Sequence, residues 1–180
     1  ENFSHPLFIG ALNEAGSPTG FFEGYIDEVK IYPYARTADQ VKQDYNAGLS
    51  GMSSKSGVAA SFGGSSDKWM SDGLVGYWKM DETATTSGAI DSSGNGNDGV
   101  YYGNASTTGG KFGNGGVFDG LNDHVDVGNV SDLAFERTDA FSMSAWIKSS
   151  DNVAAVVGKM YNVAGYEGYE IYLQNGYWNV

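Results

Sequence analysis

In this 180-residue chain, the feature that most constrains the fold is the order in which its predicted strands occur. Residues 21–47, FFEGYIDEVKIYPYARTADQVKQDYNA, predict a closing strand followed by a short capped helix, whereas residues 74–127 predict the opening strands of a domain. The fold is therefore completed either within the chain in permuted order or by a neighbouring copy. We accordingly divide the chain into closing strands and a helix (1–48), a Ser/Gly-rich linker (49–73) and opening strands (74–180).

Composition points to a packed β protein and excludes several classes of function. Hydrophobic residues make up 41% of the chain and aromatic residues 14%, and 27 glycines require many tight turns between short strands. A formal charge of −12 repels nucleic acid, so we expect no nucleic-acid partner. The chain has no cysteine, which excludes disulfides and thiolate metal sites. No run reaches the ~18 apolar residues that would span a membrane.

The clearest strand in the closing segment runs from Tyr25 to Tyr32. Because side chains alternate along a strand, we expect one face to carry Tyr25, Asp27, Val29 and Ile31, and the other to carry Ile26, Glu28, Lys30 and Tyr32. Pro33 ends this strand.

A helix is predicted directly after this strand. Thr37 and Gln40 have the spacing of a capping box, which predicts a helix of about ten residues with Val41 and Tyr45 on one face. Gly48 is a suitable residue to end it.

In the opening segment, turn signals separate short strands. Phe141–Lys148 alternates clearly, so that Phe141, Met143, Ala145 and Ile147 face together. Further strands are predicted at 74–80, 116–119, 125–127, 153–161, 166–173 and 176–180. One short helix among many strands predicts an all-β antiparallel β-sandwich.

Four segments in this order carry a family resemblance: GLVGYWKMDE (73–82), DSSGNGNDG (91–99), FDGLNDHVDV (118–127) and FSMSAWIK (141–148). They resemble the first half of a laminin-G-like domain of the concanavalin-A-like lectin/glucanase class. GYIDEVKIY (24–32), with its helix, resembles the last strand and end of such a domain. The resemblance implies a concanavalin-A-like jelly-roll β-sandwich.

The middle of such a domain has no counterpart here. A tryptophan-histidine strand and a Tyr-Asp-Gly hairpin are the segments that the resemblance leads us to expect and that the chain lacks. We therefore expect central strands to be missing. Either the chain is one segment of a larger tandem protein, or another copy completes the sandwich at its open edges.

The resemblance also implies a structural calcium site. In related jelly rolls an aspartate of the last strand binds calcium together with carbonyl oxygens from the first strand and from a turn. Carried over, this implies Asp27 with the neighbourhoods of Asp81, Glu82, Asp119 and Gly120. The alternative is that Asp27 is simply a buried, hydrogen-bonded aspartate.

A second acidic segment has two explanations of its own. The loop that begins at Asp91 is similar to a calcium loop but lacks its distal glutamate, and the tight turns favoured by Asn and Gly explain it as well.

We predict no catalytic activity. Glycosidases need paired carboxylates, and the Glu-x-Asp-x-x-Glu pattern of related jelly-roll glucanases does not occur. Glu167 and Glu170 are the nearest approach, but a spacing of three places them on opposite faces of a strand. We expect His124 to be a surface residue.

Aromatic side chains could stack against sugar rings, or simply pack in the sheets. They are Tyr101, Tyr102, Tyr161, Tyr166, Tyr169, Tyr172, Tyr177 and Trp178.

Taken together, these patterns predict a non-catalytic, extracellular or cell-surface laminin-G-like module. It would serve adhesion or glycan recognition within a larger, repetitive prokaryotic surface protein, with a glycan or a surface protein as its partner. The alternative is a structural subunit of an extracellular filament or layer, whose copies associate by sharing strands.

Overall fold

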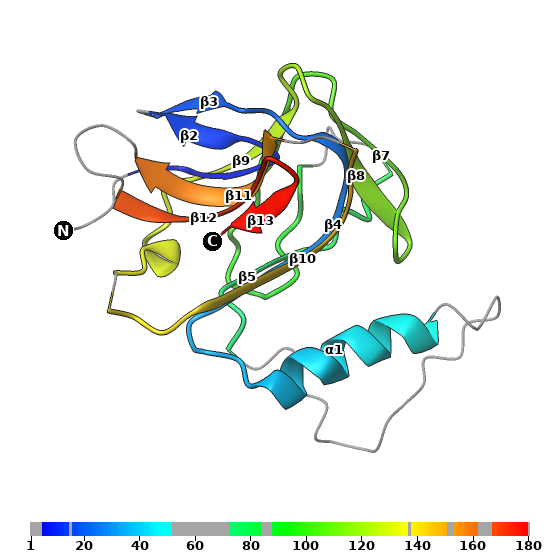
Figure 1. Ribbon diagram of the computed structural model, residues 1–180, viewed down its shortest axis with the longest axis vertical. Coiled ribbons are helices and arrows are strands. Elements are labelled where there is room, and N and C mark those ends of the chain that lie inside the picture. Colours follow the sequence, from blue (N-terminus) through cyan, green and yellow to red (C-terminus); the bar gives the residue numbers. More distant parts are fainter. Residues whose placement is uncertain are drawn as a thin grey trace.

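The protein is described from a computed structural model that covers residues 5–14, 16–51, 73–83, 88–136, 138–150, 153–161 and 167–179. Two antiparallel sheets face one another and one α-helix lies beside them (Figure 1). This arrangement confirms the predicted all-β sandwich with one short helix.

The first sheet has six strands in the order β13-β12-β11-β1-β9-β6. Their bounds are Leu7–Ile9 (β1), Val100–Tyr102 (β6), His124–Gly128 (β9), Val153–Tyr161 (β11), Glu167–Gln174 (β12) and Tyr177–Asn179 (β13). A small hairpin lies against β11 and consists of Leu12–Glu14 (β2) and Ser17–Thr19 (β3).

The second sheet curls around the other side of the core (Figure 1). Its strands follow the order β10-β4-β8-β7, and β5 also pairs with β4. Their bounds are Glu23–Tyr32 (β4), Gly76–Trp78 (β5), Ser106–Gly109 (β7), Asn114–Asp119 (β8) and Ser142–Lys148 (β10). The helix α1 runs from Ala38 to Gly51, and a 3₁₀ turn covers Ser131–Leu133.

The N-terminal segment supplies an interior strand to each sheet. β1 lies between β9 and β11, and β4 pairs with β10 along one edge and with β8 and β5 along the other. The closing strands thus complete, within one chain, the sheets that the opening strands begin. The calcium set implied by the resemblance would bring Asp27 close to Asp119, but the register places Asp119 opposite Glu23.

The core lies between the two sheets and is made of large apolar side chains. Trp78 is fully buried at its centre, and its ring nitrogen donates to the carbonyl oxygen of Asn97 at 2.9 Å. Around it pack Leu7, Ile9, Phe22, Ile26, Val29, Ile31, Met80, Phe118, Val125, Leu133 and Val157.

A bulge in β4 decides which side chains reach this core. Lys30 lies opposite Ser144 and Asp27 lies opposite Trp146, so β4 contains one more residue than β10 in this stretch. Glu28 has a φ of 55°, which accommodates the extra residue. Past the bulge the alternation changes phase, and Ile26 enters the core while Asp27 faces outward.

The predicted faces of this strand are therefore wrong in their first half. Strict alternation placed Tyr25 and Asp27 with Val29 and Ile31, whereas Ile26 is the residue that joins these two in the core. Period-two reasoning assumes an unbroken ladder, and the bulge breaks it.

The capping box at the start of α1 is confirmed. The Gln40 amide donates to the Thr37 hydroxyl oxygen at 3.3 Å, and the Thr37 amide donates to Gln40 Oε1 at 2.9 Å. The helix has 14 residues and continues through Gly48, so the predicted end is wrong. Val41 and Tyr45 share a face as predicted but remain largely exposed. Most of the predicted linker, residues 52–72, lies outside the described residues.

Cysteines introduced at Tyr25 and Val117 should form a disulfide within one chain. These two residues are direct cross-strand partners of β4 and β8, and antiparallel partners lie within the Cα separation that a disulfide spans. We expect the oxidised double variant to migrate on a denaturing gel as a compact monomer. The two single-cysteine variants are the controls. A covalent ladder from the double variant alone would show exchange of the N-terminal segment between copies, and failure to cross-link would contradict the register.

Candidate functional site

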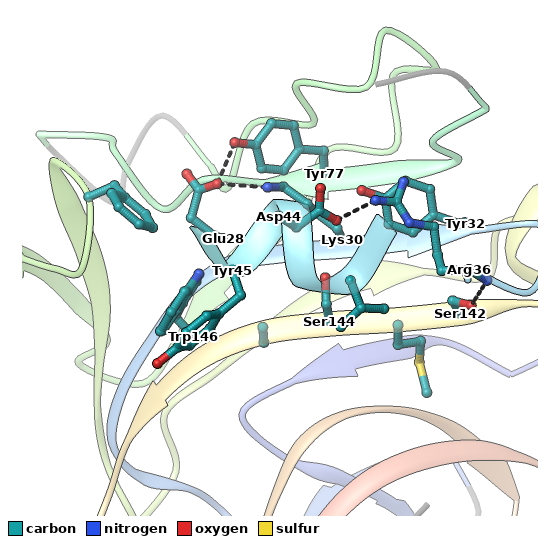
Figure 2. Close-up of a pocket in the computed structure, with 14 residues that line it drawn as sticks. Glu28, Lys30, Tyr32, Arg36, Asp44, Tyr45, Tyr77, Ser142, Ser144 and Trp146 are labelled. Atoms are coloured by element: carbon teal, nitrogen blue, oxygen red, sulfur yellow. Dashed lines mark hydrogen bonds and ion pairs between the residues drawn. The ribbon is translucent and has the colours of Figure 1, made fainter. Parts of the chain in front are cut away.

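A groove crosses the outer face of the second sheet. Its first part, about 760 Å³, lies between α1 and strands β4, β5 and β10 (Figure 2). Its second part, about 480 Å³, continues over β4 and β10 to the loop after β7. The two hollows meet at Trp146, which lines both.

Trp146 is a half-buried ring at the centre of this groove. It faces outward because Met143, Ala145 and Ile147 of the same strand pack against the core. Tyr45 of α1 stacks beside it, with ring centroids 5.4 Å apart and planes 20° from parallel. Figure 2 shows these two rings together at one end of the first hollow.

The loop after β7 contributes the opposite wall. The Phe112 ring meets Trp146 edge-on, at a centroid distance of 5.9 Å. Lys111 places its Nζ 4.6 Å from the centroid of the same ring. Trp146 is thus held between a helix and a loop that lie far apart in the sequence.

Asp27 fixes that loop in place. Its Oδ2 accepts the backbone N–H groups of Lys111 and Phe112 at 2.7 and 2.9 Å, and the residue is only 2% exposed. Gly110 has no space for a side chain, because a Cβ there would lie 2.6 Å from Oδ2. Burial raises the pKa of Asp27 from 3.8 to about 6, although the two amide donors oppose the shift.

A polar cluster lines the floor of the first hollow. Glu28, turned outward at the bulge, accepts the Tyr77 hydroxyl at 2.5 Å and forms an ion pair with Lys30 at 3.1 Å. The Lys30 Nζ also lies 4.7 Å from the centroid of the Tyr77 ring. Burial, followed by the bond to Glu28, raises the pKa of Tyr77, so its hydroxyl remains a hydrogen-bond donor at neutral pH.

Arg36 attaches the beginning of α1 to the sheet. Its guanidinium lies 4.3 Å from the centroid of the Tyr32 ring and forms an ion pair with Asp44 at 2.5 Å. Its backbone N–H donates to the Ser142 hydroxyl at 2.8 Å, and that hydroxyl donates to the Tyr34 carbonyl at 3.0 Å. These bonds fix the position of the helix relative to β10, and therefore the width of the groove.

The residues predicted for calcium lie in more than one place, although Asp81 is near enough to Asp27 that, besides burial, its charge raises the pKa of Asp27. Asp81 accepts the backbone N–H of Asn114 at 2.8 Å. Glu82 accepts the N–H of Ile90 at 2.9 Å and the hydroxyl of Tyr101 at 3.0 Å. Both acidic side chains thus hold neighbouring loops.

Asp119 and Gly120 form a turn at the end of β8. Asp119 accepts the N–H of Leu121 at 2.9 Å, and the Gly120 N–H donates to the Phe22 carbonyl at 3.1 Å. Across the described ranges, no three Asp, Glu or His side chains are grouped as a metal site would require. The structure brings Asp81 close to Asp27 but leaves Asp119 and Gly120 in a separate turn, and calcium binding stays a prediction. Asp27 Oδ1, which is buried and has no hydrogen-bond partner among the described residues, is the oxygen that best suits a cation.

The acidic loop that begins at Asp91 is organised as a turn. Asp91 Oδ1 accepts the amides of Tyr77 and Ser93, each at 2.9 Å, and Oδ2 accepts the Asn97 amide at 3.0 Å. The Asn97 side chain in turn donates to the Val75 carbonyl at 2.7 Å. Hydrogen bonds to the protein therefore account for both carboxylate oxygens of Asp91.

Among the described residues, none of the aromatic side chains predicted from sequence to stack against sugars lines the groove. Tyr169 packs in the core and donates its hydroxyl to the Leu133 carbonyl at 2.8 Å. Tyr102 stacks on His124, which is buried at 8% exposure rather than a surface residue. Trp178 and Tyr166 have no described side chain.

The sequence analysis did not predict the groove, although two of the residues that line it belong to recognisable local patterns. Trp146 alternates with the apolar face of its strand, and Tyr45 was placed on a helix face whose partner was unknown. Neither pattern states that the two rings meet.

Comparisons with protein-family models, with curated proteins and with solved structures find no match to this chain. The laminin-G-like resemblance therefore stays a prediction. Within the described residues, no helix has the length and apolar character needed to cross a membrane.

Replacing Asp27 with Asn should change how stability depends on pH. Because the folded pKa is raised from 3.8 to about 6, the contribution of Asp27 is fully present below pH 3.8 and is lost as pH rises through about 6. We expect the free energy of unfolding of the wild type, relative to the Asn variant, to increase by up to about 3 kcal/mol between pH 7 and pH 4. Denaturant titrations in chelator-containing buffer measure this, and parallel pH profiles would contradict it.

Calcium should stabilise the fold through Asp27. If one ion binds only the folded state, the free energy of unfolding should rise by about 2.7 kcal/mol at a hundredfold excess over the Kd. Thermal melts of dialysed protein with and without calcium test this, with Asp27→Asn as the variant that loses the effect. A melting temperature that neither calcium nor chelator changes would refute the prediction.

Proposed function

We propose that this protein is a non-catalytic extracellular module for adhesion through glycan recognition, and that the groove at Trp146 is its glycan site. The observation that carries the proposal is a half-buried indole ring, with a second ring beside it, in a groove lined by hydrogen-bonding side chains. Aromatic faces bind the apolar face of a sugar ring, and polar groups around them bind its hydroxyls.

The groove has suitable groups for both tasks. Trp146 and Tyr45 supply aromatic surface, and Ser144 on the same strand is exposed along the floor. Glu28 and Lys30 offer acceptor and donor groups within the same hollow. The two hollows, of about 760 and 480 Å³, each have a volume typical of ligand sites, which commonly enclose about 300–1,000 Å³, so the groove can hold a short oligosaccharide.

The cell-surface location in this proposal comes from the laminin-G-like resemblance. Trp146 belongs to the segment 141–148, which is one of the four segments that carry this resemblance and which forms β10 in the structure. The proposal includes no catalytic step: Glu28 and Asp44 form ion pairs with Lys30 and Arg36, and Oδ2 of Asp27 accepts backbone amides.

The second candidate function is that of a structural subunit that assembles by sharing strands. It is favoured by β10, which pairs with β4 on one edge and, among the described residues, has no strand on the other. An open edge accepts a further strand through main-chain hydrogen bonds. Sedimentation over a range of concentrations separates the candidates: a monomer that binds glycans supports recognition, whereas polymer formation supports assembly.

Substituting Trp146 with alanine should abolish most of the glycan binding. Loss of a central aromatic anchor should weaken binding by roughly ten- to thirtyfold, and Trp146→Phe should restore part of it. A glycan array identifies the ligands, and calorimetry with the best of them compares the variants. Tyr102→Ala is the matched control, because Tyr102 is an exposed ring on the other sheet. Equal losses in both alanine variants, or no loss in Trp146→Ala, would contradict the proposed site.

A further inference from the structure

The groove concentrates positive charge on a strongly acidic protein. The chain has 22 acidic and only 10 basic residues. Four of these basic residues line the two hollows of the groove: Lys30, Arg36, Lys111 and Lys148. Three acidic residues line them as well, namely Asp27, Glu28 and Asp44. The groove therefore carries more positive than negative groups, in contrast to the chain as a whole.

The positive charge is not evenly distributed within the groove. In the first hollow Lys30 is paired with Glu28, and Arg36 with Asp44. The second hollow is lined by two basic residues, Lys111 and Lys148, and by one acidic residue, Asp27.

The two lysines of the second hollow are placed beside aromatic rings. Lys111 Nζ lies 4.6 Å from the centroid of Trp146, and Lys148 Nζ lies 5.7 Å from that of Tyr25. Trp146 and Lys148 are two residues apart on β10 and so share its outer face, while Lys111 approaches from the loop after β7. A ligand on the Trp146 ring would therefore meet ammonium groups from two different elements.

We infer that the ligand of the groove is an acidic glycan, whose sugar ring lies on Trp146 and whose carboxylate or sulfate group lies between Lys111 and Lys148. This inference rests on the proposed function and specifies its ligand. An ammonium group attracts an anionic substituent more strongly than a neutral hydroxyl, since charge-assisted hydrogen bonds are about twice as strong as neutral ones. The remaining acidic surface repels polyanions, so the protein should select a ligand that fits this one hollow.

Neutralising the two lysines tests this inference. The probes are oligogalacturonate with its carboxyl-reduced neutral form, and a heparin oligosaccharide with its desulfated form. We expect Lys111→Gln and Lys148→Gln each to weaken binding of the preferred acidic probe about tenfold more than binding of its neutral form. Binding should also weaken as the salt concentration rises from about 50 mM to about 500 mM, because the Debye length becomes shorter and the attraction between the lysines and the anionic group is screened. Lys42→Gln is the matched control, because Lys42 lies on exposed α1 surface and does not line the groove.

The outcomes separate this inference from the proposed function. Preference for oligogalacturonate assigns a carboxylate ligand, and preference for the sulfated probe assigns a sulfate ligand. If neutral oligosaccharides bind through Trp146 as tightly as acidic ones and the lysine variants change nothing, this inference is overturned and the proposed function stands. If no glycan binds, both are overturned. Tighter binding of a single-stranded DNA oligonucleotide than of any acidic glycan would also overturn the inference.

Discussion

The double pairing of β4 is the constraint on which the rest of the structure depends. One strand holds β10 along one edge and both β8 and β5 along the other, so its register sets the second sheet. The bulge at Asp27 and Glu28 then divides the roles of its side chains. Ile26 is turned inward to the core, while two consecutive carboxylates are turned outward to the groove. A single extra residue thus serves both packing and the candidate site.

Several acidic side chains hold backbone segments in place by accepting hydrogen bonds. Some of the residues behind the net charge of −12 therefore have a structural role. Asp27, Asp81, Asp91, Asp119 and Asp123 each accept backbone N–H groups, from the loop after β7, from the turn after β8 or from residues of β5 and β8. A buried amide without a partner is costly, and an ionised acceptor satisfies it well. The aspartate-rich motifs that resemble calcium loops are therefore also explained by turn geometry.

Sequence reasoning predicted elements whose signals are local. The strand at 153–161 matches β11, and the Thr37–Gln40 capping box forms as expected. β6 and β7 escaped prediction because their sequences, VYY and STTG, do not alternate between apolar and polar residues. The bulge in β4 has no signature in the sequence pattern, so the side of the sheet on which Asp27 lies could not be predicted. The stacking of Tyr45 on Trp146 depends on where α1 lies, which no local pattern encodes.

The chain leaves and re-enters the second sheet at one point, because Ile31 at the end of β4 lies opposite Gly76 at the start of β5. The described residues between these strands, 33–51 and 73–75, include α1 and add no strand to either sheet, so they form an excursion from the sheets. The entropy of closing such an excursion grows only slowly with its length. Evolution can therefore lengthen, shorten or replace this stretch, and with it one wall of the groove, while the register of both sheets stays intact. Ligand preference and folding can in this way diverge independently among related chains.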